Sequence, residues 1–248
     1  MMNVKKYLDS TYLKTPAQSG LTEDETIKIV KELTDEAIEN QLFAVMIRPD
    51  YVSEIRHYIN SKNANVVLGT VIGFHEGTAS IDAKLLEAEK AIKDGADELD
   101  FVINYEAFKK DEIDLVKEEF VKCTKLALEK GKVAKWIIEI AALTDEQIAD
   151  ITAKIWTWSL ENFSEADFKN IFVKSSTGFY QTEGGKPNGA TFEGIKIMLD
   201  NAGKLSVKAA GGVRSHDDAV KMINLGVKRI GTSSALALTR NETSEGGY

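Results

Sequence analysis

Short apolar segments rich in β-branched residues alternate along this chain with longer amphipathic segments, and this alternation restricts the fold more than any other feature. The apolar segments are almost continuously hydrophobic, as expected of parallel strands covered on both faces. Eight strand candidates occupy residues 6–13, 42–49, 65–74, 98–104, 134–143, 170–179, 205–212 and 228–234, and the first has the weakest pattern. Eight strands with intervening helices in 248 residues predict a (β/α)8 TIM barrel, an α/β fold, with an open doubly wound sheet as the alternative.

Helix boundaries are marked by capping residues. The sequences TEDE (22–25) and TDEQ (144–147) have the pattern of a capping box, and Ser215 precedes an acidic first turn. Gly95 and Gly226 each stand between an amphipathic segment and the next strand candidate, where a helix is expected to end.

No Pro- or Ser-rich linker divides the chain, so we expect one barrel domain over residues 1–248, with a flexible tail from about residue 240. Two segments look inserted. Residues 157–170 precede the sixth strand candidate, and residues 180–190 follow it. The second segment is polar and Gly-rich, which predicts a mobile loop over the mouth of the barrel.

Charge and composition exclude several classes of protein. The net charge of -8 argues against nucleic acid as a partner, because phosphate backbones require a basic surface. The longest apolar runs are far shorter than a membrane span. The lone Cys123 cannot form an internal disulfide and the first residues lack a signal-peptide pattern, so a cytoplasmic protein is expected.

Charged residues occupy inward-facing positions on four strand candidates. Alternate residues of a barrel strand point inward, which places Lys174, Lys208, Lys135 and Asp100 in the interior, together with Glu139. A single such lysine is commonly ion-paired or reaches solvent with its ammonium group. Two lysines at matching positions on two strands, each before a turn of small residues, indicate a functional site because burying charge is costly.

The lysine pair predicts a particular chemistry. A free lysine has a pKa of about 10.4, and only the neutral amine is a nucleophile. Burial and a second cation both lower that pKa. The pair therefore favours a Schiff base with a carbonyl substrate, whose iminium accepts electrons when a neighbouring carbon–carbon bond breaks. Asp100 is the inward carboxylate available for acid–base catalysis.

Phosphate recognition is indicated at the ends of the last three strand candidates. Backbone N–H groups, hydroxyl groups and one guanidinium at these turns would bind a phosphate. The residues concerned are Gly178, Gly211, Gly212, Arg214, Gly231, Ser233 and Ser234.

Four segments carry a resemblance to a known family. DELDFVINY, FVKSSTGF with NGATFEGIKIM, VKAAGGVRSHDDA and RIGTSSALAL together resemble the 2-deoxyribose-5-phosphate aldolases, and the resemblance runs from LDSTYLK to GTSS. It implies a (β/α)8 barrel that cleaves 2-deoxy-D-ribose 5-phosphate reversibly into acetaldehyde and D-glyceraldehyde 3-phosphate, without a metal or other cofactor.

The resemblance also implies residue roles. Lys174 matches the Schiff-base lysine, Lys208 the neighbour that perturbs it and helps to move protons, and Asp100 the acid–base carboxylate. Three further positions match polar residues near the substrate: Asp9, Thr11 and Lys135.

The chain departs from the family pattern at three places. Ser175 stands where the family usually has Thr, IAA (140–142) follows KWIIE where a small hydroxyl residue or Gly is usual, and GFHEG (73–77) replaces a turn that contains Pro. These departures concern substrate breadth and loop geometry, since no catalytic group is lost.

Other functions stay open at this point. The alternatives are another lysine-dependent aldolase, such as a transaldolase-like barrel, and a non-catalytic phosphosugar-binding barrel. The three histidines, His57, His75 and His216, are scattered and predict no metal site. The predicted partner is a small phosphosugar or aldehyde. The sequence does not determine the oligomeric state, and a homodimer is one alternative.

The C-terminal segment NETSEGGY supports a separate hypothesis. Its ordinary role is that of a disordered end. Tyr248, however, carries a dissociable hydroxyl on the flexible pair Gly246–Gly247. A tail folded over the barrel mouth would bring this hydroxyl in as the acid that protonates the enamine carbon after cleavage.

Overall fold

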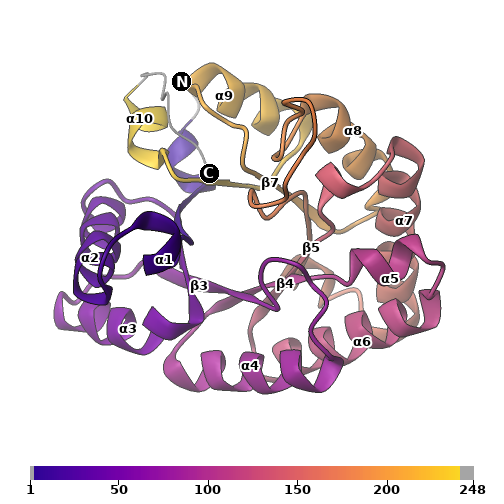
Figure 1. Ribbon diagram of the computed structural model, residues 1–248, viewed down its shortest axis with the longest axis horizontal. Coiled ribbons are helices and arrows are strands. Elements are labelled where there is room, and N and C mark those ends of the chain that lie inside the picture. Colours follow the sequence, from indigo (N-terminus) through magenta and orange to yellow (C-terminus); the bar gives the residue numbers. More distant parts are fainter. Residues whose placement is uncertain (1–2, 241–248) are drawn as a thin grey trace.

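Eight parallel strands close into a barrel in the computed structural model, which describes residues 3–240 (Figure 1). Each strand pairs with its neighbours in sequence, and β1 pairs with β8. This closure confirms the predicted barrel and excludes the open sheet. The strands are β1 Leu8–Tyr12, β2 Ala44–Ile47, β3 Val67–Ile72, β4 Glu98–Val102, β5 Val133–Ile137, β6 Ile171–Lys174, β7 Ser206–Ala210 and β8 Arg229–Thr232.

Helices form a ring around the strands, as Figure 1 shows. The α-helices are α1 Pro16–Ser19, α2 Glu23–Glu39, α3 Val52–Ser61, α4 Ile81–Asp94, α5 Tyr105–Lys109, α6 Ile113–Glu129, α7 Asp145–Asn162, α8 Phe192–Asn201, α9 His216–Leu225 and α10 Ala235–Thr239. Four 3-10 turns accompany them: η1 Val4–Tyr7, η2 Pro49–Tyr51, η3 Ile140–Ala142 and η4 Phe168–Asn170. None of the helices in the described part of the chain is both long and apolar enough to cross a membrane.

The predicted capping residues set the helix ends. Thr22 and Thr144 each form a complete capping box at the start of α2 and α7, and the Ser215 hydroxyl accepts from Asp218 N at the start of α9. Gly95 ends α4 in the left-handed conformation (φ 109°), which a residue with a Cβ rarely adopts.

The hydrophobic core lies between the strands and the helix ring. Trp136 of β5 stacks on Phe101 of β4, with ring centroids 5.0 Å apart, and contacts Phe120 of α6 at 5.2 Å. All three side chains are fully buried. Because these outward positions supply the apolar packing, the inward positions of the same strands are free to carry polar groups.

The prediction that residues 157–170 are an insertion is wrong. Residues up to Asn162 continue α7, and η4 leads directly into β6. Trp158 is buried and its ring lies 5.8 Å from that of Phe120, so the segment belongs to the packed helix layer. The Thr and Trp residues near the end of α7 are weaker helix formers than Ala or Leu, which obscured the helix in the sequence.

The segment 180–190 is a loop between β6 and α8, as predicted. Ala190 N donates to Ala210 O at 3.0 Å, so the end of the loop is fixed to the end of β7. Figure 1 shows this loop in orange, arching beside β7 near the centre of the barrel. The tail segment that contains Tyr248 lies outside the described residues.

Candidate active site

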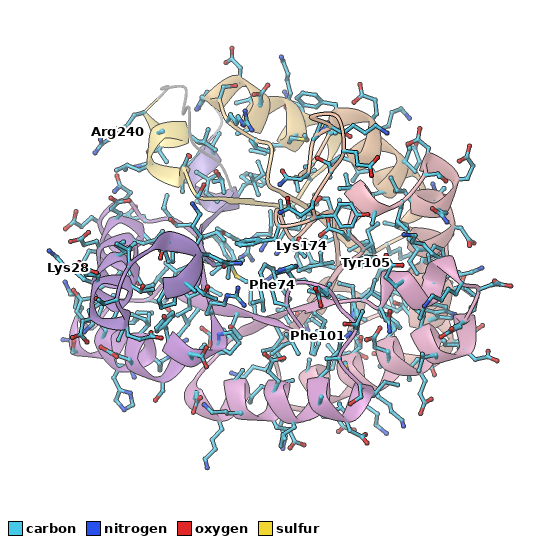
Figure 2. All side chains as sticks on the ribbon, in the orientation of Figure 1. Lys28, Phe74, Phe101, Tyr105, Lys174 and Arg240 are labelled. Atoms are coloured by element: carbon cyan, nitrogen blue, oxygen red, sulfur yellow. The ribbon has the colours of Figure 1, made fainter. Side chains whose placement is uncertain are left out.

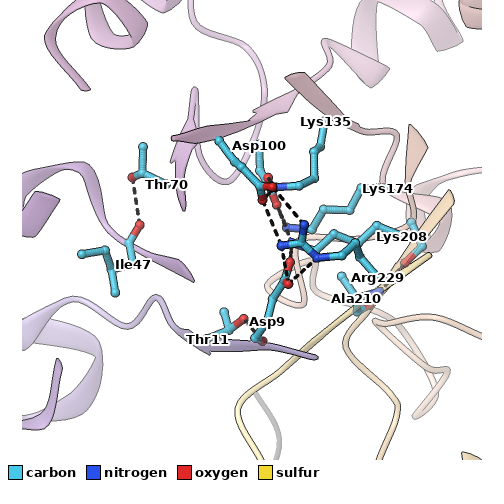
Figure 3. A network of polar contacts seen from close by, with 12 residues as sticks. Asp9, Thr11, Ile47, Thr70, Asp100, Lys135, Lys174, Lys208, Ala210 and Arg229 are labelled. Carbon is cyan, nitrogen blue, oxygen red and sulfur yellow. Dashed lines mark hydrogen bonds and ion pairs between the residues drawn. The ribbon is translucent and has the colours of Figure 1, made fainter. Parts of the chain in front are cut away.

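The strand register brings the predicted charged residues together. Asp100 pairs with Lys135 across β4 and β5, and Lys174 pairs with Lys208 across β6 and β7. All four side chains are buried inside the barrel, where Figure 3 shows them converging. The alternation of inward and outward residues therefore predicted their positions correctly.

Asp100 contacts all three lysines of this cluster. Its Oδ1 lies 2.6 Å from Lys135 Nζ, and its Oδ2 lies 2.8 Å from Lys174 Nζ and 2.9 Å from Lys208 Nζ. Burial by itself would raise the pKa of Asp100, but attraction to the three ammonium groups outweighs it and holds the pKa well below its usual value. Asp100 is therefore an anion that accepts from three lysines.

A second layer of ion pairs continues the cluster. Lys208 Nζ also lies 2.6 Å from Asp9 Oδ2, and Arg229 Nε donates to Asp9 Oδ1 at 2.7 Å. Arg229 binds both oxygens of Glu98 at 2.9 Å, the bidentate geometry that suits a guanidinium. The face of Arg229 lies over the Phe43 ring, 3.6 Å from its centroid.

Cations exceed carboxylates by one in this network. Its cations are Lys135, Lys174, Lys208 and Arg229, and its carboxylates are Asp9, Glu98 and Asp100. Loss of one proton from a lysine would balance the charges, so one amine of the set is favoured in its neutral form.

Lys174 gives up its proton more readily than an ordinary lysine. Burial lowers the pKa of Lys174 to about 8, with help from the nearby cations Lys208 and Lys135 and against the attraction of Asp100. Asp100 and Glu98, in contrast, outweigh burial at Lys135 and raise its pKa. Burial thus contributes more than the second cation that the sequence pattern emphasised.

A further buried carboxyl, that of Glu139, lies just after the mouth end of β5. Glu139 Oε2 accepts from Thr177 N at 3.1 Å and from the Thr177 hydroxyl. Burial raises the pKa of Glu139 to about 7, although these hydrogen bonds and Lys174 oppose the change. In the adjacent turn, Ser175 Oγ accepts from Ala210 N at 3.0 Å, so serine at this position still ties β6 to β7.

Aromatic rings bridge the mouth from the loop after β3 to the loop after β6. The Phe179 ring stacks on His75 with centroids 5.7 Å apart and meets the edge of Phe74 at 5.1 Å. The Arg48 guanidinium lies 4.8 Å from the centroid of Phe74. Phe74 and Lys174 both lie near the centre of the helix ring in Figure 2. The segment GFHEG (residues 73–77), where the chain departs from the family pattern, therefore covers part of the site.

Three of the predicted glycines meet at the ends of β6, β7 and β8. Gly211 N donates to Gly231 O at 3.2 Å, and a Cβ on Gly211 would lie 3.9 Å from Gly178 Cα. Gly189 packs against the same turn, where an added Cβ would lie only 2.6 Å from Gly211 C. Such close backbone approach leaves no room for a Cβ at Gly189.

Comparison with known proteins agrees with this geometry. Residues 7–242 match the profile of the DeoC/LacD family aldolases. The chain belongs to this aldolase family. A relative from Thermococcus gammatolerans, named deoxyribose-phosphate aldolase, is 40% identical over 238 residues, which are 96% of this chain and 95% of the relative.

Two solved structures are also similar to the chain. A putative deoxyribose-phosphate aldolase from Coccidioides immitis superposes with a TM-score of 0.79 at 31% identity, covering 96% of this chain and 84% of that one. A deoxyribose phosphate aldolase from Aeropyrum pernix, described as tetrameric, gives a TM-score of 0.75 at 30% identity and covers 96% and 89% of the two chains.

Five further predicted substrate residues of this family member lie on β1 or just after β7 and β8. Thr11 is buried, and its hydroxyl donates to Asp9 O at 2.9 Å. Ser234 N donates to Thr232 Oγ1 at 3.0 Å. Arg214 and Ser233 are exposed after β7 and β8, as is Gly212 in the turn after β7, so their predicted contact with phosphate stays a prediction.

Sequence reasoning missed Glu98 and Arg229. Glu98 stands two residues before Asp100 on β4, an inward position already recognised, so extending that alternation by one step would have identified it. Arg229 pairs with Lys208 in the register of β7 and β8, and the sequence analysis assigned no inward position on β8. Within residues 3–240, no three His, Cys, Asp or Glu side chains converge as a metal-binding group.

Proposed function

We propose that this protein is a Schiff-base aldolase that reversibly cleaves 2-deoxy-D-ribose 5-phosphate into acetaldehyde and D-glyceraldehyde 3-phosphate. One observation carries the proposal. A buried lysine, Lys174, has a pKa of about 8 and belongs to a network with one cation in excess. Such an amine reaches its neutral, nucleophilic form near physiological pH.

The proposed reaction begins at Lys174. Its neutral amine adds to the aldehyde carbon of the open-chain sugar, and loss of water gives an iminium. Cleavage of the bond between the second and third carbons then sends its electron pair into the iminium, which becomes an enamine. The proton of the third-carbon hydroxyl must leave in the same step.

Asp100 and Lys208 are the proposed route for that proton. Asp100 is ionised and contacts Lys174 and Lys208 through the same oxygen, Oδ2. Lys208 also contacts Asp9. A proton taken up here can therefore be shared among groups that are already linked by ion pairs. Lys135, held between Glu98 and Asp100, keeps the carboxylate in place.

The phosphate group is proposed to bind at the glycine turns. Gly178, Gly211 and Gly231 lie together, and Gly212, Arg214, Ser233 and Ser234 follow directly in the chain. Backbone N–H groups at the turns and the guanidinium of Arg214 are suited to a dianionic phosphate. Binding of the phosphate at these turns would orient the aldehyde end of the sugar toward Lys174.

Reductive trapping tests the proposed reaction. Wild-type protein treated with acetaldehyde and borohydride should gain the mass of one ethyl group, and a peptide map should locate it on Lys174. Lys174→Ala should remain folded, take up no label at this peptide, and lose turnover by about 10⁴-fold or more. An adduct on Lys208 or Lys135 would contradict the assignment.

A second experiment tests the phosphate site. Arg214→Ala should weaken use of deoxyribose 5-phosphate by about ten- to a hundredfold, because a charge-assisted phosphate contact contributes about 1.5–3 kcal/mol. Ser233→Ala should have a smaller effect in the same direction. Free deoxyribose should be affected little, and Lys221→Ala on the exposed face of α9 controls for the loss of a positive charge. Equal losses on both sugars would exclude a phosphate contact.

Location and assembly complete the proposal. The lone Cys123 is buried, which is compatible with the cytoplasm as the proposed location. A homodimer remains a prediction from the sequence, and the Aeropyrum pernix relative is described as a tetramer. Light scattering of the purified protein decides between these states.

A further inference from the structure

The residue that the proposed reaction leaves unused is Glu139. It is fully buried and follows the end of β5, and β5 is the neighbour of the strand that carries Lys174. Ile137 pairs with Lys174 in the register, so Glu139 stands two residues farther along the chain toward the mouth. Asp100 pairs with Lys135, two residues before Ile137. Lys174 therefore has one carboxyl-bearing position on the inner side and one on the mouth side.

The backbone is bent at Glu139 in a way that redirects its side chain. Ile138 N donates to Lys174 O at 3.0 Å, and Ile140 N donates to Ser175 O at 2.9 Å. Two steps along β5 thus match only one step along β6, and Glu139 occupies the extra position with φ 56°. A bulge of this kind re-aims a side chain, and a left-handed conformation at a residue with a Cβ is unfavourable unless its surroundings hold it.

Among the described residues, only one of the two oxygens of the Glu139 carboxyl has hydrogen-bond partners. Thr177 N and the Thr177 hydroxyl both bind Oε2, whereas Oε1 is buried and has no hydrogen-bond partner within residues 3–240. Ser176 Oγ, in the same turn, is buried and likewise without a partner among the described residues. Buried polar atoms are nearly always hydrogen-bonded, so a carboxyl oxygen left open beside a nucleophile indicates a bound group or a proton.

We propose, on the basis of the function proposed above, that the Glu139 carboxyl is a second proton-transfer group of the site and protonates the hydroxyl that leaves as water when the Lys174 adduct becomes an imine. The neutral amine first adds to the carbonyl carbon and gives a carbinolamine. The glutamic acid then donates its proton to the carbinolamine hydroxyl, the carbon–oxygen bond breaks, and the nitrogen lone pair forms the double bond. The products are an iminium cation, a glutamate anion and water, so atoms and charge balance without a co-reactant.

Asp100 cannot supply this proton. It is surrounded by three ammonium groups and its pKa is held well below the usual value, so it is ionised at neutral pH. Burial, in contrast, raises the pKa of Glu139 to about 7, which lets it hold a proton and release it near neutrality. The charged or titratable groups facing Glu139 are Lys174 of β6 and Tyr105 of α5, and burial together with Glu139 raises the pKa of Tyr105 to about 12. Tyr105 is therefore neutral in this range and leaves Lys174 as the charged neighbour.

The pH dependence of Schiff-base formation tests the proposal on the wild-type protein. The trapping rate with acetaldehyde, measured by rapid quench into borohydride and mass spectrometry, should be bell-shaped with an optimum between pH 7 and 8. Lys174 must be neutral, which gives the acidic limb, and Glu139 must be protonated, which gives the basic limb. A rate that only rises with pH would overturn the proposal.

Glu139→Gln identifies the group responsible. It retains an oxygen that accepts from Thr177 but has no proton to transfer, so trapping should slow by about a hundredfold or more and the basic limb should disappear. Glu139→Asp, which keeps a carboxyl, should trap acetaldehyde faster than Glu139→Gln and should show the basic limb again. The matched control is Asp167→Asn, which changes a half-buried carboxyl that accepts from Ser164 N just before η4, and it should keep both the rate and the limb.

Thr177→Val separates proton transfer from a merely structural role. It removes the hydroxyl that binds Glu139 and leaves the carboxyl in place, so the bell shape should persist. If Glu139→Gln traps acetaldehyde at the wild-type rate, or if it slows no more than Thr177→Val and keeps the basic limb, the carboxyl only shapes the turn and the inference is wrong. Absence of any adduct on wild-type Lys174 would instead contradict the proposed function itself.

Discussion

Two systems of buried ion pairs, one outside the barrel and one inside it, use lysine in different ways. Outside the barrel, Lys84 of α4 pairs with Glu119 of α6, and both side chains are buried. Lys84 Nζ also donates to Gly77 O and Val102 O at 2.7 Å, and Glu119 Oε2 accepts from Asn104 N at 2.9 Å. All three N–H groups of this ammonium therefore have an acceptor, and the pair fastens the loops that follow β3 and β4.

Inside the barrel the acceptors are shared. Lys174 and Lys208 both bind Asp100 Oδ2, and the network contains one more cation than carboxylates. Burial costs both systems solvation, but Lys84 has an acceptor for each N–H group, whereas Lys174 shares its carboxylate oxygen with Lys208. The difference shows that the supply of acceptors, rather than burial alone, separates a structural lysine from one that is ready to react.

Removing the outer lysine should have the largest effect on stability. Lys84→Met leaves Glu119 buried without its cation and should lower the free energy of unfolding by about 3–5 kcal/mol. The folded fraction should still form the Schiff base on Lys174, because Lys84 does not contact the charged cluster. Urea unfolding, with acetaldehyde trapping on the folded protein, measures both quantities.

The double variant Lys84→Met/Glu119→Gln is the control for this prediction. It removes both charges and retains an acceptor for Asn104 N, so much of the lost stability should return. A single variant as stable as wild type would mean that the two systems do not differ as described.

Removing the inner lysine should instead increase stability at neutral pH. The pKa of Lys174 is about 8 in the folded protein, against 10.5 for an ordinary lysine, so the unfolded chain binds the extra proton between these values. Wild-type stability therefore rises with pH through this window, and the charged form below pH 8 costs about 3 kcal/mol. Lys174→Met has no ammonium group to bury and therefore avoids this cost.

The measurement is the difference in unfolding free energy between wild type and Lys174→Met at several pH values. The variant should be the more stable protein at pH 7, and its advantage should shrink as the pH rises from 8 toward 10.5. A difference that does not change with pH would show that Lys174 is as well compensated as Lys84.

The smallest effect is expected from Lys208→Leu. Lys208 lowers the pKa of Lys174 and shares Asp100 with it, so its loss removes a repelling cation and leaves more of the carboxylate to Lys174. The acidic limb of the pH–rate profile should move upward by about one to two pH units. A profile of unchanged position would indicate that the two amines do not interact. Lys221→Leu on α9 is the matched surface control.

The sequence by itself determined the barrel and most of the inner cluster. The eight apolar segments, the capping boxes at Thr22 and Thr144, and the two-residue alternation on each strand are local patterns, and a closed parallel barrel makes that alternation decide which side chains point inward. Asp100, Lys174 and Lys208 were located correctly for this reason. In the one segment misjudged, residues 157–170, the first six residues are the end of α7, where Trp158 packs against Phe120 although Thr and Trp are weak helix formers.

Only the tertiary structure decided which groups compensate one another. Glu98 and Arg229 are separated by 131 residues in sequence, yet they form a bidentate pair in the barrel interior. The excess of one cation, and with it the lowered pKa of Lys174, depends on the whole set of charges that meet there. The bend that turns Glu139 toward Thr177 arises from a mismatch between two neighbouring strands. Neither a charge balance nor a strand mismatch is a property of any single segment, because both depend on distances that exist only after the chain has closed.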